Sequence, residues 1–146
     1  MKIYKLTSAQ SDEVYVGKTN KTLDERFCKH FCEYKRWLKG IGKFNSSYFL
    51  TEYDDVKIEL IEENNNSLKE IYWIRQLNSC NFYFNGPDYF IYKQQAKDCL
   101  HGFIYVFEIR RNNKRLVGKK SVDLDYLRKF RNEWIKNNEH LFIEDC

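Results

Sequence analysis

Two short segments near the beginning of the sequence alternate polar and apolar side chains with a period of two, and this feature constrains the fold most. "KIYKL" (2–6) and "EVYVG" (13–17) both follow the pattern, which is typical of half-buried β-strands. The polar stretch "TSAQSDE" between them predicts a loop of medium length. We therefore expect a β-hairpin, one face of which needs other elements to cover it.

The next segments predict a helix and a third strand. Thr22 and Glu25 have the spacing of a capping box, which satisfies the free N–H groups of a helix start. Gly40 ends this helix, and "VKIELIE" (56–62) alternates again. The helix carries one apolar stripe at spacings of three and four, and its members are Leu23, Phe27, Phe31, Tyr34 and Leu38.

A second helix follows the third strand. Ser67 and Glu70 repeat the capping-box spacing ahead of a segment with one apolar side, so Glu70 could serve only as part of a helix cap. Together these elements predict the α+β class for residues 1–86: a small domain with a three-stranded antiparallel sheet flanked by helices.

The rest of the chain predicts a separate unit. Residues 87–101 have no strong period and are predicted to be a linker. Residues 102–146 predict two strands joined at Asn112–Asn113, followed by an amphipathic helix. We expect this strand-strand-helix unit to pack tightly on itself, because so short a segment has little core of its own.

The charge distribution singles out this second unit. The whole chain has a net charge of +4, but residues 108–131 carry nine basic and three acidic side chains. Such an excess attracts a phosphate backbone, although a solvated surface has the same composition. We expect DNA contacts from Arg110, Arg111, Lys114, Arg115, Lys119 and Lys120.

Composition limits the other classes of function. Five cysteines occur without CxxC spacing, and no stretch reaches the roughly 18 apolar residues of a membrane span. We expect a reducing intracellular location, no membrane partner and no small-molecule cofactor. Cys28 and Cys32 are spaced to share a metal on one helix face, but ordinary thiols are the simpler interpretation.

The hairpin carries the first candidate site residues. Tyr4 and Tyr15 are expected at equivalent places on adjacent strands about 4.8 Å apart, so that the two phenols share one face. Gly17 is expected to end the second strand and to let a backbone or ligand approach closely. Lys18 follows it with a positive charge suited to a phosphate.

The helices carry the remaining candidates. Arg26 and His30 are four residues apart on one helix, Glu70 lies at the beginning of the next, and Asn85 follows fifteen residues later. A lone carboxylate can hold a hard divalent cation that keeps waters. An arginine can bind phosphate as charge builds, and a phenol or imidazole can take the proton of an attacking water. The set could therefore hydrolyse a phosphodiester.

These residues and their spacing resemble the GIY-YIG nuclease family. "KIYKL" followed by "YVG", then "LDERFCKH", then "EIYWIRQLN" and Asn85 are similar to its motifs in the same order, over about residues 1–86. The resemblance implies a DNA endonuclease with one Mg²⁺ or Mn²⁺ ion held by Glu70. Tyr4 would act as, or help form, the general base, and Tyr15 would position that base and the scissile phosphate.

The resemblance assigns roles to three further residues and shows two departures. Arg26 would stabilise the pentacovalent phosphate, His30 would support proton movement or orient a tyrosine, and Asn85 would fix the end of the active-site segment or contact a strand. Lys2 stands where the family usually has glycine, and Asn45 stands about where some members have another histidine.

Three functions stay open at this point. The first is a homing-type, viral or mobile-element endonuclease targeted by its basic tail, which loosely resembles AP2-like DNA-binding modules. The second is a structure-specific nuclease acting on flaps or junctions in repair or recombination. The third is a catalytically inactive nucleic-acid-binding module. The oligomeric state, monomer or transient dimer on DNA, is equally open.

Overall fold

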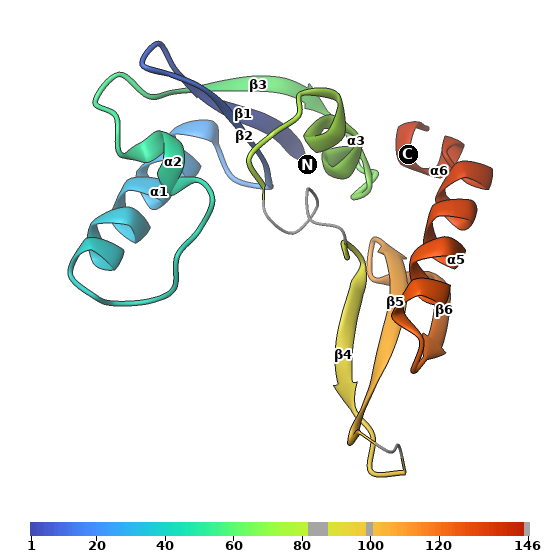
Figure 1. Ribbon diagram of the computed structural model, residues 1–146. Helices are drawn as coiled ribbons and strands as arrows, with labels where there is room; N and C mark the ends of the chain where they lie inside the picture. The colour runs from blue at the N-terminus through green and yellow to red at the C-terminus, as the bar shows by residue number, and fades with distance from the viewer. Residues whose placement is uncertain (82–87, 99–100, 145–146) are drawn as a thin grey trace.

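The computed structural model describes residues 1–81, 88–98 and 101–144, and there the chain forms two antiparallel three-stranded sheets with helices beside them (Figure 1). The sheet orders are β2-β1-β3 and β4-β5-β6. The predicted α+β class and the first three-stranded antiparallel sheet are confirmed. In chain order the elements are β1 (Lys2–Ser8), β2 (Ser11–Thr19), α1 (Leu23–Leu38), α2 (Tyr48–Thr51), β3 (Lys57–Glu63), α3 (Lys69–Gln76), β4 (Ile91–Gln95), β5 (Phe103–Arg111), β6 (Lys114–Ser121), α5 (Leu124–Asn137) and α6 (His140–Ile143).

The turn between β1 and β2 is tighter than the sequence predicts. Only Ala9 and Gln10 separate the strands, because Ser8 and Ser11 still pair in the ladder. Asp55 holds this turn by accepting hydrogen bonds from the Ser8 hydroxyl at 2.5 Å and the Ala9 N–H at 3.1 Å. The polar residues therefore belong mostly to the strands, and the predicted loop of medium length is wrong.

Helix α1 begins as predicted and buries an unexpected residue. The Thr22 hydroxyl accepts the Glu25 N–H and the Glu25 carboxylate accepts the Thr22 N–H, both at 3.2 Å. The first three members of the predicted apolar stripe pack against the core of the first sheet. Leu38 is 61% exposed, so the stripe ends early, whereas His30 is completely buried.

The start of α3 differs from the predicted capping box. The Ser67 hydroxyl accepts the Asn112 N–H at 2.8 Å, and Leu68, not Ser67, occupies the N-cap position. The Asn66 side-chain oxygen accepts the Leu68 N–H at 3.0 Å. The predicted Ser67–Glu70 cap is therefore wrong, because Ser67 holds the β5–β6 turn, and the Glu70 carboxylate is left for another partner.

The second sheet contains a strand where the sequence predicts a linker. β4 pairs with β5 from Ile91↔Phe107 to Gln95↔Phe103. Its side chains are mostly exposed, so it has no hydrophobic alternation, and the pairing with β5 makes it a strand. A linker over residues 91–95 is therefore wrong. The predicted turn at Asn112–Asn113 is confirmed, with φ of +51° and +66°, as a tight hairpin turn requires.

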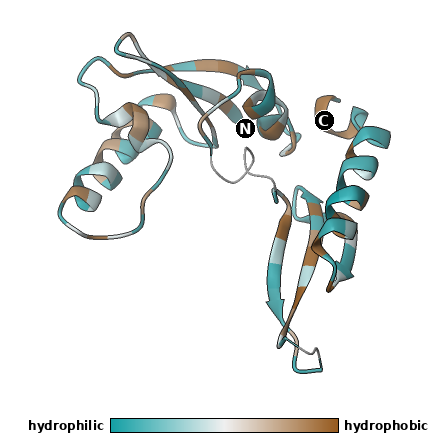
Figure 2. Cartoon of the chain, in the orientation of Figure 1, coloured by the Kyte–Doolittle hydropathy of each residue, from teal (hydrophilic) through white to brown (hydrophobic). Residues whose placement is uncertain are grey.

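Helix α3 packs into both halves of the chain. Its residue Ile74 packs with Ile3 of β1 and Val16 of β2. Its residue Ile71 joins the cluster formed by the second sheet and α5, and so does Leu68, the N-cap residue of the helix. Figure 2 shows hydrophobic residues on α3 and β5, two elements of this cluster. The division at residues 86 and 102 stays a prediction, because the helix with Glu70 contributes to two cores.

A buried asparagine joins the same two parts. Asn66 is fully buried, and its side-chain amide donates to the carbonyls of Leu141 and Glu144 at 2.9 and 3.0 Å. The end of the chain around α6 therefore helps to hold the beginning of α3. None of the helices in the described residues is both long and apolar enough to cross a membrane.

Candidate active site

The first sheet places Tyr4 directly across Gly17. These two residues are paired between β1 and β2, and a Cβ atom at position 17 would lie 2.5 Å from the Tyr4 hydroxyl oxygen and 2.6 Å from Cζ. Glycine is needed here because the phenol lies over its backbone. The expectation that Gly17 ends the strand is wrong: β2 continues to Thr19, and the space above the glycine belongs to Tyr4.

Tyr4 and Tyr15 share a face, but as diagonal neighbours rather than at equivalent places. Tyr15 pairs with Leu6, two residues further along β1. The Tyr4 and Tyr15 ring centroids lie 6.5 Å apart, and His30 lies 5.8 and 5.4 Å from them. Strand alternation puts both phenols toward α1, which supplies the histidine between them.

The Tyr4 hydroxyl joins the two predicted residues of α1. It lies 2.6 Å from His30 Nε2, and it accepts a hydrogen bond from Arg26 Nε at 3.0 Å. Burial, followed by the nearby Arg26 charge, lowers the pKa of His30 to about 3. The imidazole is therefore neutral at pH 7, and with its proton on Nδ1 it accepts the Tyr4 O–H.

Both phenols are held in their protonated form. Burial raises the pKa of Tyr4 well above its ordinary value, and burial raises the pKa of Tyr15 to about 12. The negative charge of Glu70 raises both pKa values further, whereas Arg26 lowers them. Neither phenolate exists in quantity at pH 7, so either phenol can act as a base only if its own proton leaves at the same time.

Glu70 forms an ion pair with Lys18 of β2. The Lys18 Nζ atom lies 2.9 Å from a Glu70 carboxylate oxygen, and the side chains are 41% and 13% exposed. The described residues contain no group of three His, Cys, Asp or Glu side chains that could hold a metal ion. One recessed carboxylate still fits a Mg²⁺-type ion, because such an ion keeps most of its waters and needs few protein ligands.

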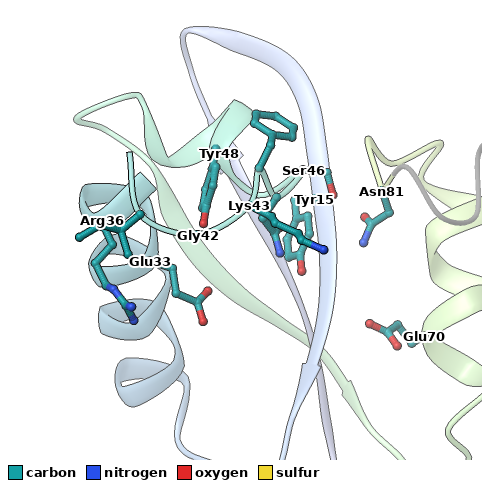
Figure 3. A pocket seen from close by; sticks show the side chains of 12 residues that line it. Tyr15, Glu33, Arg36, Gly42, Lys43, Ser46, Tyr48, Glu70 and Asn81 are labelled. Atoms are coloured by element: carbon teal, nitrogen blue, oxygen red, sulfur yellow. The ribbon is translucent and has the colours of Figure 1, made fainter. Parts of the chain in front are cut away.

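Tyr15 and Glu70 line a pocket of about 620 Å³ that sequence reasoning did not foresee (Figure 3). Tyr4, Arg26 and His30 are not part of its lining. Glu33 and Arg36 of α1 line one side, whereas Glu70 and Asn81 line the other. The sequence could have indicated Glu33, which lies seven residues after Arg26 and three after His30, and Arg36 follows Glu33 by three residues. The lining residues in the loop between α1 and α2 carry no such periodic signal. The full lining is Tyr15, Glu33, Arg36, Ile41, Gly42, Lys43, Phe44, Asn45, Ser46, Tyr48, Glu70 and Asn81.

Asn81 fixes the strand beside Tyr15. Its side-chain oxygen accepts the Val16 N–H at 3.1 Å, and its amide donates to the Val16 carbonyl at 2.8 Å. The Ser79 hydroxyl donates to the same oxygen at 2.8 Å. Asn81 thus ties the segment after α3 to β2. The predicted site residue Asn85 lies outside the described residues, so its role stays a prediction.

The six predicted DNA-binding residues do not share one surface. The ladder pairs Arg110 with Arg115 and Lys120 with Val106, which places all three basic residues on the sheet face opposite α5. Lys119 lies over the Phe130 ring of α5 at 5.7 Å, and thus on the other face.

Two of these basic residues have acidic partners. Arg110 donates to Glu108 at 2.6 Å, and Arg111 is paired with Glu144 near the end of the chain. Lys114 follows the Asn112–Asn113 turn and pairs with Arg111 in the ladder. Fewer of the six predicted basic residues are therefore available to contact DNA than the sequence indicates.

Comparison of the sequence with known protein families agrees with the geometry of the first sheet. A sequence model described as the GIY-YIG catalytic domain matches residues 1–84, more than half of the chain. No curated protein and no solved structure matches it.

Proposed function

The chain belongs to the GIY-YIG nuclease family, and from this premise we propose that it is a metal-dependent endonuclease that hydrolyses phosphodiester bonds of DNA. The observation that carries the proposal is the Tyr4 hydroxyl. It is hydrogen-bonded to both Arg26 and His30, and the negative charge of Glu70 contributes to its raised pKa. A proton acceptor, a cation and a carboxylate therefore converge on one site.

We assign the metal site to Glu70 and one divalent ion, Mg²⁺ or Mn²⁺. When bound, such an ion neutralises charge on the phosphate oxygens. Lys18 has to leave the carboxylate to make room, because its ammonium group lies 2.9 Å from a Glu70 oxygen. Because the Lys18 side chain is partly exposed, its ammonium group can turn to a phosphate oxygen of the bound DNA. Release from Glu70 would in this way give Lys18 its expected role at the phosphate.

Tyr4 and His30 handle the proton as a unit. As the attacking water gives its proton to the Tyr4 oxygen, the Tyr4 O–H passes its own proton to Nε2 of His30. Because the pKa of His30 is only about 3, the imidazolium does not keep this proton at pH 7, and the proton has to leave for solvent within the same turnover. The raised pKa of Tyr4 opposes a stored phenolate, and the 2.6 Å contact makes the transfer short. The Arg26 Nε–H stabilises negative charge on the same oxygen. Tyr15 then positions the phosphate from the neighbouring strand.

We propose that the second sheet brings the site to DNA. Arg115 and Lys120 line a shallow hollow of about 250 Å³ on its open face, together with Tyr92 and Glu108. Such exposed cations position a backbone through its phosphates. This favours the homing-type or mobile-element nuclease. A flap- or junction-cutting nuclease is the second candidate, favoured by the open pocket beside Glu70, and action as a monomer or as a transient dimer fits either.

The test is cleavage of supercoiled plasmid with Mg²⁺ or Mn²⁺. Glu70→Gln keeps the size of the side chain, removes its charge and is expected to lower the cleavage rate at least about 100-fold. Glu63→Gln, at the exposed end of β3, is the matched control and should cut like the native protein. A chelator should abolish cutting. Equal cleavage by Glu70→Gln would show that Glu70 holds no essential metal, and tight DNA binding without any cutting would favour the inactive binding module.

A further inference from the structure

The pocket beside Glu70 has an apolar wall that the proposed proton and metal chemistry does not use. Ile41 and Phe44, in the loop between α1 and α2, line it and are 49% and 43% exposed. Ligand sites commonly combine an apolar or aromatic wall with a few polar groups, in volumes of roughly 300–1,000 Å³. The volume of about 620 Å³ lies within this range.

The Phe44 ring is held in a fixed orientation by its aromatic neighbours. Its centroid lies 5.4 Å from Trp37, 5.6 Å from Tyr48 and 5.3 Å from Phe49, with interplanar angles of 72°, 86° and 68°. These edge-to-face contacts fix the ring, while the residue lines the pocket and keeps 43% of its surface exposed. A pre-oriented aromatic ring is a surface on which a nucleobase can stack.

The loop that carries Phe44 is also anchored. The Asn45 side-chain oxygen accepts the Ser47 N–H at 2.9 Å, and the Asn45 carbonyl accepts the Tyr48 N–H at 2.9 Å. The Cys80 thiol donates to the Ser46 carbonyl at 3.5 Å. Because the residues directly after Phe44 are bonded, this end of the apolar wall has a defined place relative to the pocket.

The charges around the pocket suit a nucleotide. Arg36 and Lys43 line it, and Glu70 lies on the opposite side (Figure 3). Two cations can bind phosphates that flank a base, while a metal at Glu70 binds the scissile phosphate. Glu70 and Phe44 line the same pocket, so a strand whose phosphate lies at Glu70 can place a neighbouring base there.

We propose that this pocket takes up one unpaired nucleobase of the DNA strand, stacked on Phe44, next to the scissile phosphate. The inference rests on the proposed nuclease function and develops its second, structure-specific candidate, which the pocket favours: the substrate class is DNA with an unpaired nucleotide at the cut. A base inside an intact duplex is stacked on both faces and must be extruded to enter, whereas an unpaired base pays least for leaving the stack.

The test compares two short dye-labelled duplexes of the same sequence, one with a single additional unpaired adenine. Binding is measured by fluorescence anisotropy in chelator, so that no cutting occurs. The native protein should bind the bulged duplex about 5- to 100-fold more tightly, which is the size expected for stacking one base on an aromatic ring. With Mg²⁺ it should cut next to the unpaired adenine.

Three variants show whether Phe44 causes this preference. Phe44→Leu keeps an apolar side chain but loses the ring, and should lose most of the preference. Phe44→Trp should retain it. Tyr126→Leu is the matched control, because Tyr126 of α5 is similarly exposed and does not line the pocket, and it should behave like the native protein.

The two proposals fail in different ways. Equal binding of both duplexes by a native protein that cuts plasmid would overturn the base pocket and leave the nuclease intact. A preference that persists in Phe44→Leu would overturn the role of Phe44 and with it the inference. A native protein that cuts neither plasmid nor duplex with metal would overturn the nuclease proposal and this one together.

Discussion

The first and second sheets place their polar side chains in opposite environments. On the first, Tyr4 and His30 are completely buried and Tyr15 is 8% exposed. On the second, Arg115 and Lys120 are exposed on the face opposite α5. Burial shifts pKa values and fixes orientation, so the first sheet can move protons. Exposed cations are accessible to a large partner, which is the basis of the proposal that the second sheet positions a phosphate backbone.

Helix α3 connects these two environments. It carries Glu70 between the core that contains Ile74 and the core that contains Ile71. A change in the second sheet can therefore reach Glu70, the proposed metal ligand, through packing, without any contact with the phenols. The comparison of the two sheets is best tested by making the same substitution in each.

The largest effect is expected from removing one phenol oxygen. Tyr4→Phe takes away the atom that bonds both Arg26 and His30, and cleavage should fall about 10²- to 10⁴-fold, the usual contribution of general acid–base catalysis. The rate is measured by plasmid nicking under saturating Mg²⁺. Tyr105→Phe, a half-buried tyrosine of β5, should leave the rate nearly unchanged. Similar losses in both variants would mean that Tyr4 acts only through stability.

A smaller effect, on stability, is expected from adding a methyl group to each sheet. Gly17→Ala should lower the free energy of unfolding by about 1–3 kcal/mol, because its Cβ meets the buried Tyr4 phenol. Gly118→Ala should cost much less, since its nearest neighbour at 3.3 Å is the exposed and flexible Arg115 side chain. Urea unfolding of both variants measures the difference. Equal losses would show that the Tyr4 ring can move aside.

The last effect, measured over the narrow range from pH 6.5 to 5, is a pH dependence of stability from His30. Its folded-state pKa of about 3 lies below the ordinary 6.5, so the unfolded chain binds this proton more readily than the folded chain. The contribution of His30 to the free energy of unfolding is therefore fully present above about pH 6.5. It falls as the pH drops toward 3, by up to about 1.4 kcal/mol per pH unit. Between pH 6.5 and 5 the native protein should lose more stability in urea than His30→Gln. Parallel losses would show that His30 is not the source of the dependence.

Local patterns predicted most of the fold. Alternation indicated β1 to β3, the Thr22–Glu25 pair indicated the start of α1, and the adjacent asparagines indicated the β5–β6 turn. These features depend on neighbours in the sequence, which is why they could be recognised. β4 could not, because its side chains are mostly exposed and its structure comes from pairing with β5. The Ser67–Glu70 cap failed for a similar reason, since Ser67 bonds a turn 45 residues away.

The sequence by itself determined which residue types occur, in which order and at which spacing, and this was enough to propose Tyr4, Arg26, His30 and Glu70 together. Only the tertiary structure decided how they act. It buried His30 against the Tyr4 oxygen, placed Gly17 beneath that ring and paired Glu70 with Lys18. It also formed the pocket from α1, a loop and the segment after α3. Burial and long-range contact depend on how elements pack, and neither is encoded in the spacing of neighbouring residues.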